Sequence, residues 1–369
     1  MSRRIKKISV AVLFGGRSGE HEVSIVSARS VIASLDPKKY RIYPIGITKE
    51  GEWVLTSSVD AFIKRKGGEV CTLMPDPRLK GISTLRGNKR AIRIDVVFPV
   101  LHGTYGEDGA LQGLLELTGI PYVGPGVLGS STGMDKDIMK RLFMVAGLPV
   151  VQFISFTREE WQRTKKVIVK KINRLKYPVF VKPANLGSSV GITKIHSARQ
   201  LSQALALAFS FDRKVVVERG IERARDIECA VLGNDMPRAS LPGEIISSNE
   251  FYDYDAKYVD GQSQAVIPPK ISQELIKKVQ RMSLRAFQSL DLMGMARVDF
   301  LLQGRTLYIN ELNTIPGFTA ISMYPKLWEA SGVPYPALLD KLINFALSYH
   351  KKKNALRRTY TPKRAWYSA

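Results

Sequence analysis

Short apolar runs typical of β-strands alternate with stretches of helical spacing along the first third of the chain. Residues 8–14 form a β-rich run closed by two glycines, and residues 23–35 then carry apolar side chains at helical spacing. Residues 43–48 and 95–101 are typical of further buried strands. Because strands that alternate with helices form mostly parallel sheets covered on both faces, we expect a parallel-sheet α/β domain over residues 1–124.

The rest of the chain predicts two further units and a tail. Residues 125–218 alternate helices with strands, and the pattern over 219–350 is richer in strands. We therefore expect a fold of mixed α/β and α+β class, followed by a basic tail at 351–369 that we expect to be disordered. The main elements predicted after residue 124 are helices at 135–145, 158–174, 273–290 and 336–349, strands at 150–153, 179–182 and 215–218, and a hairpin at 297–312.

Basic residues are in large excess, with 56 Lys and Arg against 33 Asp and Glu and a formal net charge of +23. Such an excess favours nucleic acid, an anionic membrane or a polyphosphate substrate as partner. Four basic residues at 1–7 and seven at 351–369, with no acids in either segment, account for about half of it. A nucleotide site would explain only a local part of the remainder.

Cysteine usage and hydropathy argue against two other classes of protein. The two cysteines, Cys71 and Cys229, are too few for a disulfide framework or a four-ligand zinc site. No apolar run reaches the roughly 18 residues that span a bilayer. The basic start at 3–7 resembles a signal peptide but lacks its cleavage pattern. We therefore expect a cytoplasmic protein with no membrane insertion.

The predicted hairpin carries the strongest chemical signal. Glu311 and Asn313 are two residues apart on one strand, so their side chains project to the same side. If the turn lies at 303–306, Asp299 comes opposite residue 310 and close to Glu311. Two carboxylates and an amide oxygen then converge.

Hard oxygen ligands of this kind suit Mg²⁺, which fills its remaining positions with water and phosphate oxygens. The alternative is an edge hairpin with a solvated acidic face. Arg297 beside the carboxylates, and a loop at 314–319 whose Pro and Gly can aim a backbone N–H at an oxyanion, favour a site.

A glycine- and serine-rich segment follows the strand that ends near Lys182. Within residues 187–191, glycines let backbone N–H groups approach phosphate oxygens, and Ser188 and Ser189 add hydroxyl donors. The segment lacks the Gly-x-x-x-x-Gly-Lys-Ser/Thr pattern of P-loop NTPases. Alone it is typical of a plain turn; together with the preceding lysine it indicates a nucleotide site.

Two glutamates open the first predicted helix, in the loop at 15–22. The loop lacks Gly-x-Gly-x-x-Gly, and Glu20 and Glu22 disfavour a pyrophosphate there. They either bind a substrate ammonium or complement the helix dipole. His102 ends a predicted strand, so it either reaches the same crevice or has a structural role.

Residues 251–258 combine tyrosines, a phenylalanine, aspartates and a lysine. Side chains that both stack and hydrogen-bond suit a lid that excludes water from a reactive intermediate. The alternative is a surface strand with alternating Tyr and Asp.

Taken in order, these segments resemble the D-alanine–D-alanine ligases of the ATP-grasp superfamily. The resemblance covers about residues 8–349 and implies a pre-ATP-grasp N-terminal domain followed by a two-lobed ATP-grasp fold, with lobes at 125–218 and 219–350. The segments that carry it are LFGGRSGEHEVS (13–24), HGTYGEDGALQGLLE (102–116), GIPYVGPG (119–126), MDK (134–136), VKPANLGSSVG (181–191), YDYDAKY (252–258), ARVDF (296–300) and NELNTIPGFTAIS (310–322).

The resemblance implies an ATP site and two Mg²⁺ ions, for which Mn²⁺ can substitute. Glu218 falls where the family meets the adenine, and Asp226 where it usually has a glutamate to the ribose, one methylene longer. Glu311 would bridge the two metal ions. The implied phosphate ligands are Lys136, Lys182, Ser188, Ser189 and Lys257, and the implied metal ligands are Asp299, Glu311 and Asn313.

The implied reaction is phosphorylation of the first D-alanine, followed by attack of the second D-alanine's amine on the acyl phosphate, for peptidoglycan precursor synthesis. Glu20 would bind the first ammonium, with His102 nearby. Arg297 and the Gly317 N–H would stabilise the oxyanion, and Ser322 would hold the second carboxylate.

Tyr258, linked to Glu20 through Ser188, resembles the dipeptide-forming members and favours D-alanine over D-lactate as acceptor. D-Serine is the harder alternative to exclude. A nucleic-acid-associated protein that retains the ligase fold is the alternative from another class, and only the tail fits its basic and aromatic pattern in part. The family is often dimeric, so we expect a homodimer.

Overall fold

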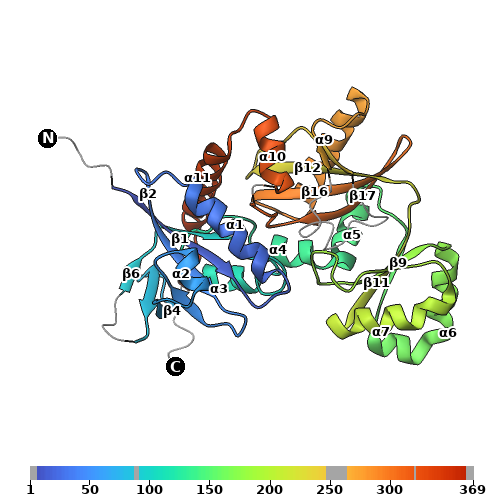
Figure 1. Ribbon diagram of the computed structural model, residues 1–369, viewed down its shortest axis with the longest axis horizontal. Coiled ribbons are helices and arrows are strands. Elements are labelled where there is room, and N and C mark those ends of the chain that lie inside the picture. The colour runs from blue at the N-terminus through green and yellow to red at the C-terminus, as the bar shows by residue number, and fades with distance from the viewer. Residues whose placement is uncertain (1–5, 87–90, 247–263, 320, 363–369) are drawn as a thin grey trace.

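The computed structural model describes residues 6–86, 91–246, 264–319 and 321–362. Its N-terminal part is a seven-stranded sheet in the order β6-β5-β4-β3-β2-β1-β7, with α1 and α3 packed against it (Figure 1). The elements are β1 Ile8–Gly15, α1 His21–Ser34, β2 Tyr40–Ile47, β3 Trp53–Leu55, α2 Val59–Ile63, β4 Glu69–Leu73, β5 Gly81–Thr84, β6 Ala91–Arg93, β7 Val96–Pro99 and α3 Ala110–Thr118.

Only part of this sheet is parallel. β1 pairs in parallel with β2 on one side and with β7 on the other, as the alternating pattern predicts. The strands β3 to β6 instead extend the sheet by antiparallel pairing. These four strands are only three to five residues long, so they leave little apolar signal in the sequence.

The central lobe is an antiparallel four-stranded sheet in the order β10-β9-β11-β8, with α6 and α7 on one face. Alternation along its strands divides the residues between two faces. Val179, Val181 and Val217 pack against the helices, while Lys182 and Glu218 line a cavity on the opposite face. The elements from residue 127 are α4 Val127–Met134, α5 Lys136–Val145, β8 Phe153–Thr157, α6 Arg158–Leu175, β9 Val179–Pro183, β10 Thr193–Ile195, a 3-10 turn at Ala198–Gln200, α7 Leu201–Phe211 and β11 Lys214–Arg219.

The C-terminal lobe is a sheet in the order β15-β14-β12-β16-β17, with β13 paired to β12. Its core is shared with α5 and α9 through Phe143, Phe287 and Phe300. The elements are β12 Arg225–Gly233, β13 Arg238–Ala239, β14 Gly243–Ile246, β15 Gln264–Val266, α9 Gln273–Ser289, β16 Gly294–Gln303, β17 Thr306–Asn313, α10 Met323–Ala330 and α11 Tyr335–Asn354.

The last helix joins the two ends of the chain. Leu338 and Leu342 of α11 belong to the same buried core as Val10 of β1 and Phe98 of β7. Helix α11 therefore completes the N-terminal sheet, and Figure 1 shows it beside α1. By contrast, the central lobe has a buried core of its own.

Two predicted boundaries are wrong. The strand predicted at 150–153 lies at Phe153–Thr157. The last helix continues to Asn354, so the first four residues of the predicted tail are helical. Lys353 in that turn lies 2.6 Å from a carboxylate oxygen of Glu116. No helix in the described ranges has the length and apolar character needed to cross a membrane.

Candidate active site

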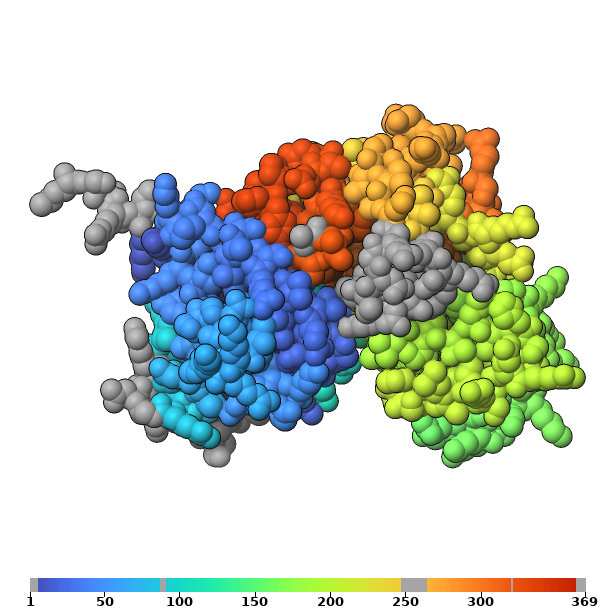
Figure 2. Space-filling view, in the orientation of Figure 1, coloured from blue at the N-terminus to red at the C-terminus, as the bar shows by residue number. Residues whose placement is uncertain are grey.

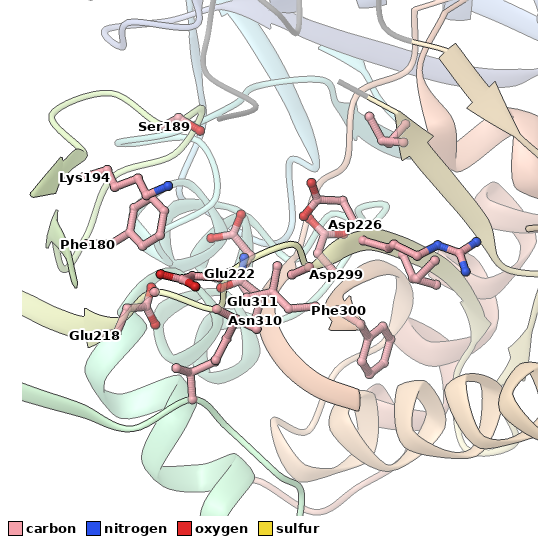
Figure 3. A pocket seen from close by; sticks show the side chains of 18 of the residues that line it. Phe180, Ser189, Lys194, Glu218, Glu222, Asp226, Asp299, Phe300, Asn310 and Glu311 are labelled. Carbon is pink, nitrogen blue, oxygen red and sulfur yellow. The ribbon is translucent and has the colours of Figure 1, made fainter. Parts of the chain in front are cut away.

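A cavity of about 670 Å³ lies between the central sheet and the C-terminal sheet (Figure 3). Lys182 and Glu218 reach it from the central lobe, and Asp226, Asp299 and Glu311 reach it from the C-terminal lobe. Seven further lining residues carry charge without having been singled out in the sequence: Lys194, Arg219, Glu222, Arg223, Arg225, Glu228 and Glu244. Cations and carboxylates therefore face each other across the space between the lobes.

The β16–β17 hairpin places Asp299 directly opposite Glu311. The sequence predicts residue 310 at this position. The difference arises from a bulge between Asp299 and Phe300, which shifts the register by one residue and leaves Asn310 without a partner in the register. The bulge brings the two carboxylates closer together in register than a regular hairpin would.

Arg297 and Asn313 complete this carboxylate group. Arg297 donates to both oxygens of Asp299, at 2.8 and 2.7 Å, and its Nε lies 3.0 Å from Oε2 of Glu228. The side-chain amide of Asn313 donates to Asp299 Oδ2 at 2.9 Å. The predicted convergence of Asp299, Glu311, Asn313 and Arg297 is thus present.

The donor set fits Mg²⁺ held partly by a nucleotide. Among the described residues, no three His, Cys, Asp or Glu side chains come together closely enough to hold a metal by themselves. Two carboxylates and one amide oxygen leave several octahedral positions to water and phosphate, which is how Mg²⁺ usually binds beside ATP. The hairpin is therefore suited to a metal–nucleotide complex and unsuited to a closed all-protein metal site.

Three buried lysines lie beside the hairpin. Lys136 donates to the Leu186 carbonyl at 2.6 Å, and its Nζ lies 3.8 Å from Glu311 Oε2. Lys182 and Lys140 both pair with the 2% exposed Glu218, Lys140 at 2.8 Å. The resemblance implies an adenine contact for Glu218, and the structure shows its carboxylate between two ammonium groups.

Lys140 is absent from the sequence-based set of site residues. It is fully buried and also donates to the Asn310 carbonyl at 2.8 Å. Its position one helical turn after Lys136 on α5 is a usable signal, because residues four apart share a helix face. Lys257 and Tyr258, together with the predicted lid, lie outside the described residues.

Glu20 lies where three loops meet. The Ser188 hydroxyl donates to Glu20 Oε1, as the resemblance implies. A Cβ atom at Gly187 would lie 2.7 Å from Glu20 Oε2, and one at Gly103 would lie 2.9 Å from the same oxygen. The glycines at both positions let the backbone approach the carboxylate closely.

The position of Glu20 also fits the helix-dipole alternative, because a carboxylate at the N-terminus of a helix complements its dipole. Glu20 occupies the N-cap position of α1, yet its side chain caps no backbone N–H of that helix. It is directed instead to Ser188, whose φ of 48°, like the 60° of Ser189, lies in the left-handed region. Such backbone geometry in two neighbouring non-glycine residues is uncommon and is found mostly at functional sites.

His102 is buried and connects the N-terminal domain to the loop after β17. Its Nδ1 lies 3.0 Å from the Ile315 carbonyl, which can only accept, so Nδ1 carries the proton. The hydroxyl of Ser27 lies 3.4 Å from Nε2 and accepts the Phe318 N–H at 3.3 Å. Burial lowers the pKa of His102, so the ring is neutral and positions the loop.

Gly317 and Ser322 lie together in that loop. A Cβ atom at Gly317 would come 2.8 Å from the Ser322 hydroxyl oxygen. This hydroxyl oxygen accepts the Thr319 N–H at 3.0 Å and lies 2.8 Å from the Thr319 hydroxyl. Ser322 is therefore held by local contacts beside the predicted oxyanion-binding backbone.

Glu107 is a second site carboxylate that the sequence reasoning missed. Its oxygens accept the N–H groups of Gly103 at 3.0 Å and Ile315 at 3.2 Å, so it joins the His102 loop to the loop after β17. Burial, and then the charge of Glu20, raise the pKa of Glu107 to about 8. Its place in the segment HGTYGED, five residues after His102, was the available signal.

We expect Glu107 to make the protein less stable as the pH rises. Because its folded-state pKa of about 8 exceeds the ordinary value of 4.5, the folded state holds the proton more tightly between these values. One such proton lowers the free energy of unfolding by up to about 1.4 kcal/mol for each pH unit in that window.

The Glu107→Gln variant removes this titration, so its free energy of unfolding should fall less steeply between pH 6 and pH 8 than that of the parent. Denaturant unfolding at several pH values measures both slopes. Equal slopes would contradict the raised pKa, whatever the absolute stability of the variant.

Comparisons with known proteins agree with this geometry. The family model described as "D-ala D-ala ligase N-terminus" matches residues 9–125, and the one described as "D-ala D-ala ligase C-terminus" matches residues 142–344. The chain is 53% identical to a D-alanine–D-alanine ligase of Thermoanaerobacter sp. strain X514 over 95% of this chain and 99% of the relative. It is 46% identical to that of Geobacillus kaustophilus over 97% and 99%.

Solved structures show the same likeness. The D-alanine–D-alanine ligase of Coxiella burnetii superposes with a TM-score of 0.85 at 38% identity, covering 95% of this chain and 97% of that one. The VanG D-Ala:D-Ser ligase of Enterococcus faecalis gives 0.83 at 37% identity, covering 92% and 100%. With both family models matched, a relative at 53% identity and an ATP-grasp architecture, the chain belongs to the D-alanine–D-alanine ligase family.

Proposed function

We propose that this protein uses ATP to join two D-alanine molecules into D-alanyl-D-alanine for peptidoglycan precursor synthesis. The observation that carries the proposal is the contact between Ser188 and Glu20, which joins the glycine-rich loop of the central lobe to the N-terminal domain. This contact brings together the loop that we assign to the phosphates of ATP and the carboxylate that we assign to the substrate ammonium group. We place the reaction in the cytoplasm, where ATP is available.

The charges at the site suit phosphoryl transfer as the first step. Lys136 and Lys182 would hold the phosphates of ATP, and Asp299, Glu311 and Asn313 would hold two Mg²⁺ ions. When bound, Mg²⁺ would neutralise the negative charge that develops on the phosphate oxygens during transfer. The γ-phosphoryl group passes to the carboxylate of the first D-alanine, whose ammonium group pairs with Glu20.

The second step forms the peptide bond. The amine of the second D-alanine, having lost a proton, attacks the acyl carbon, and inorganic phosphate leaves. Arg297 and the Gly317 N–H would stabilise the oxyanion formed in between, because preorganised donors act most strongly where charge develops. Ser322 would hold the second substrate's carboxylate, and we assign to Lys257, by the family resemblance, a contact with the γ-phosphate and to Tyr258 the choice of acceptor. We assign the adenine and ribose contacts to Glu218 and Asp226.

D-Serine is the second candidate acceptor. The structural likeness to the VanG D-Ala:D-Ser ligase favours keeping this alternative, because that enzyme shares the fold at 37% identity. The two functions differ only in the group that follows the acceptor's α-carbon, a methyl or a hydroxymethyl.

A competition assay decides between them. Purified protein is incubated with Mg-ATP and D-alanine, and D-serine or D-lactate is added at equal concentration. We expect D-alanyl-D-alanine as the main product, with one phosphate released for each dipeptide. D-Alanyl-D-serine as the main product would establish the alternative function, and the absence of both dipeptide and phosphate would refute the ligase assignment.

We propose that the protein is a homodimer joined through apolar side chains on α3, α4 and α5. The exposed fractions are 66% for Leu117, 60% for Leu128, 56% for Met144 and 88% for Val145. The three helices follow one another along the chain, α4 contacts both α3 and α5, and exposed apolar side chains commonly contribute to protein interfaces.

The variant Leu128→Asp should therefore dissociate the dimer into monomers, because it places an unpaired carboxylate in an apolar contact. Sedimentation velocity measures the oligomeric state, and Leu85→Asp, at a leucine that is 51% exposed in the N-terminal domain, serves as control. A monomeric parent protein would end the proposal, and an unchanged dimer would place the interface elsewhere.

A further inference from the structure

The outer surface of the central lobe is strongly basic along α6. Eight basic residues and two acidic ones lie between 158 and 176, and both acids are in the first turn. Ile168, Ile172 and Leu175 form the buried stripe of α6. The opposite side of the helix is exposed and carries the lysines 165, 166, 170 and 171.

These four lysines have no acidic partner among the described residues. No carboxylate there lies within 4.0 Å of their ammonium groups, although Lys165 lies 5.4 Å from the centre of the Trp161 ring. Lysines elsewhere on the surface do pair, as Lys39 does with Asp340 at 2.6 Å and Lys49 with Glu22 at 2.6 Å. Within the described part of the chain, the positive charge of these four lysines is therefore not neutralised by carboxylates.

Helix α7 lies beside α6 on the same face of the sheet and adds apolar surface without charge (Figure 1). Its sequence, LSQALALAFSF, contains no ionisable residue. Leu207 and Phe211 are 45% and 48% exposed, and Val167 between the lysines of α6 is 54% exposed. A cluster of four or more lysines on one helix is typical of surfaces that bind anionic headgroups, and exposed apolar side chains beside it can add contact with the lipid.

This surface lies on the opposite side of the lobe from the active site. The strands β9 and β11 turn Val179, Val181 and Val217 towards the helices and Lys182 and Glu218 towards the cavity. Figure 2 shows the central lobe as a separate mass at one end of the molecule, set off from the N-terminal domain. A partner bound to α6 and α7 would leave the opening between the lobes clear.

We propose that this outer face of α6 and α7 binds an anionic phospholipid surface. The face is defined by Lys165, Lys166, Lys170 and Lys171 together with Val167 and Leu207, while Phe211, at the end of α7, lies beside Gly191 and is not part of it. Charge complementarity selects anionic headgroups, and the half-exposed apolar side chains enter the boundary between headgroups and acyl chains. At about 1.5 Å per residue, the 18 residues of α6 extend far enough to contact several headgroups.

Lipid fits this face better than nucleic acid does. A nucleic-acid footprint combines basic groups with exposed aromatic rings that stack on bases or with arginines that read base edges. Four of the exposed cations of α6 are lysines, with the exposed Arg163 and Arg174 towards the two ends of the helix, and the side chains beside the lysines are mainly aliphatic. The proposal does not depend on the acceptor specificity of the enzyme.

Vesicle co-sedimentation tests the proposal on the full-length protein. We expect binding to vesicles that contain phosphatidylglycerol, no binding to vesicles of phosphatidylcholine alone, and weakening as salt is added. The variant K165Q/K166Q/K170Q/K171Q should lower the partition coefficient at least about tenfold, since each lysine near an anionic surface contributes measurably. Its dipeptide synthesis without vesicles should stay unchanged, which shows that it is folded.

The control removes the same number of charges from another helix. In K277Q/K278Q/R281Q/R285Q the substitutions lie on α9, whose basic residues belong to the C-terminal lobe. This variant should keep the partition coefficient within about twofold of the parent. Three results would overturn the proposal: no binding to phosphatidylglycerol vesicles, equal losses in the two variants, or binding of duplex DNA by the α6 lysines without binding of lipid.

Discussion

Replacing Glu311 with glutamine should lower kcat by about a thousandfold while leaving the protein folded. The variant keeps the size of the side chain but removes one of the two carboxylates that face each other across the β16–β17 hairpin. A metal ion that neutralises transferring phosphate contributes several kcal/mol to the transition state, which corresponds to a factor of this order. Steady-state phosphate release at saturating ATP and D-alanine measures the effect.

The dependence of the rate on Mg²⁺ concentration distinguishes a carboxylate that binds the metal from one that only stabilises the fold. If Glu311 holds Mg²⁺, the Glu311→Gln variant should need a higher Mg²⁺ concentration for half-maximal rate and should recover in part at high Mg²⁺. The matched control is Glu274→Gln, since Glu274 is an exposed carboxylate that contacts Arg305 in the turn of the same hairpin. Wild-type kcat in Glu311→Gln, at ordinary Mg²⁺, would remove Glu311 from the metal site.

Replacing Glu20 with glutamine should raise the KM for the first D-alanine by about a hundredfold. The carboxylate is only 8% exposed, and the loops of Gly103 and Gly187 surround it closely. Loss of one charge from a buried ion pair costs about 2–5 kcal/mol. The effect should fall on the first of the two D-alanine sites, which initial rates over a wide range of D-alanine concentration resolve.

Two further variants test whether the rise in KM comes from the contact between Glu20 and the ammonium group. Ser188→Ala removes only the hydroxyl that donates to Glu20, so its effect should be smaller, about tenfold. Glu22→Gln is the control, because Glu22 lies two residues away on the same helix but is exposed and pairs with Lys49. An equal rise in KM for Glu20→Gln and Glu22→Gln would show that net charge, and not the ammonium contact, is responsible.

The sequence predicted which residues form the carboxylate group of the β16–β17 hairpin, but it predicted their register across the two strands wrongly by one residue. Residues two apart on a strand must face the same side, so Glu311 and Asn313 could be paired without coordinates. The bulge between Asp299 and Phe300 could not be predicted from the sequence. It depends on how the two strands fit together, and no residue type at these positions requires a bulge. That single shift decides whether Asp299 faces residue 310 or Glu311.

Buried charges that act through tertiary contacts were the hardest to predict. The spacing of Lys140 from Lys136, and the place of Glu107 in the segment after His102, show that the two residues lie near the site but do not show that they are buried. Glu107 becomes buried only when the loop after β17, some two hundred residues later, supplies the Ile315 N–H. Lys140 becomes buried only when β11 supplies Glu218 and β17 supplies the Asn310 carbonyl. Both partners come from distant segments, which helical or strand periodicity does not reach.

The packing of α11 against the N-terminal sheet bears on how the protein is made. Leu338 and Leu342 cover apolar residues of β1 and β7 that are synthesised more than two hundred residues earlier. During translation α1 can cover part of this face, through Ile25, Ala28 and Val31, but the rest has no native cover until the C-terminal helix has left the ribosome. The N-terminal domain reaches its final packing last, although its residues are synthesised first, and exposed Val10 and Phe98 make the nascent chain a natural client for chaperones.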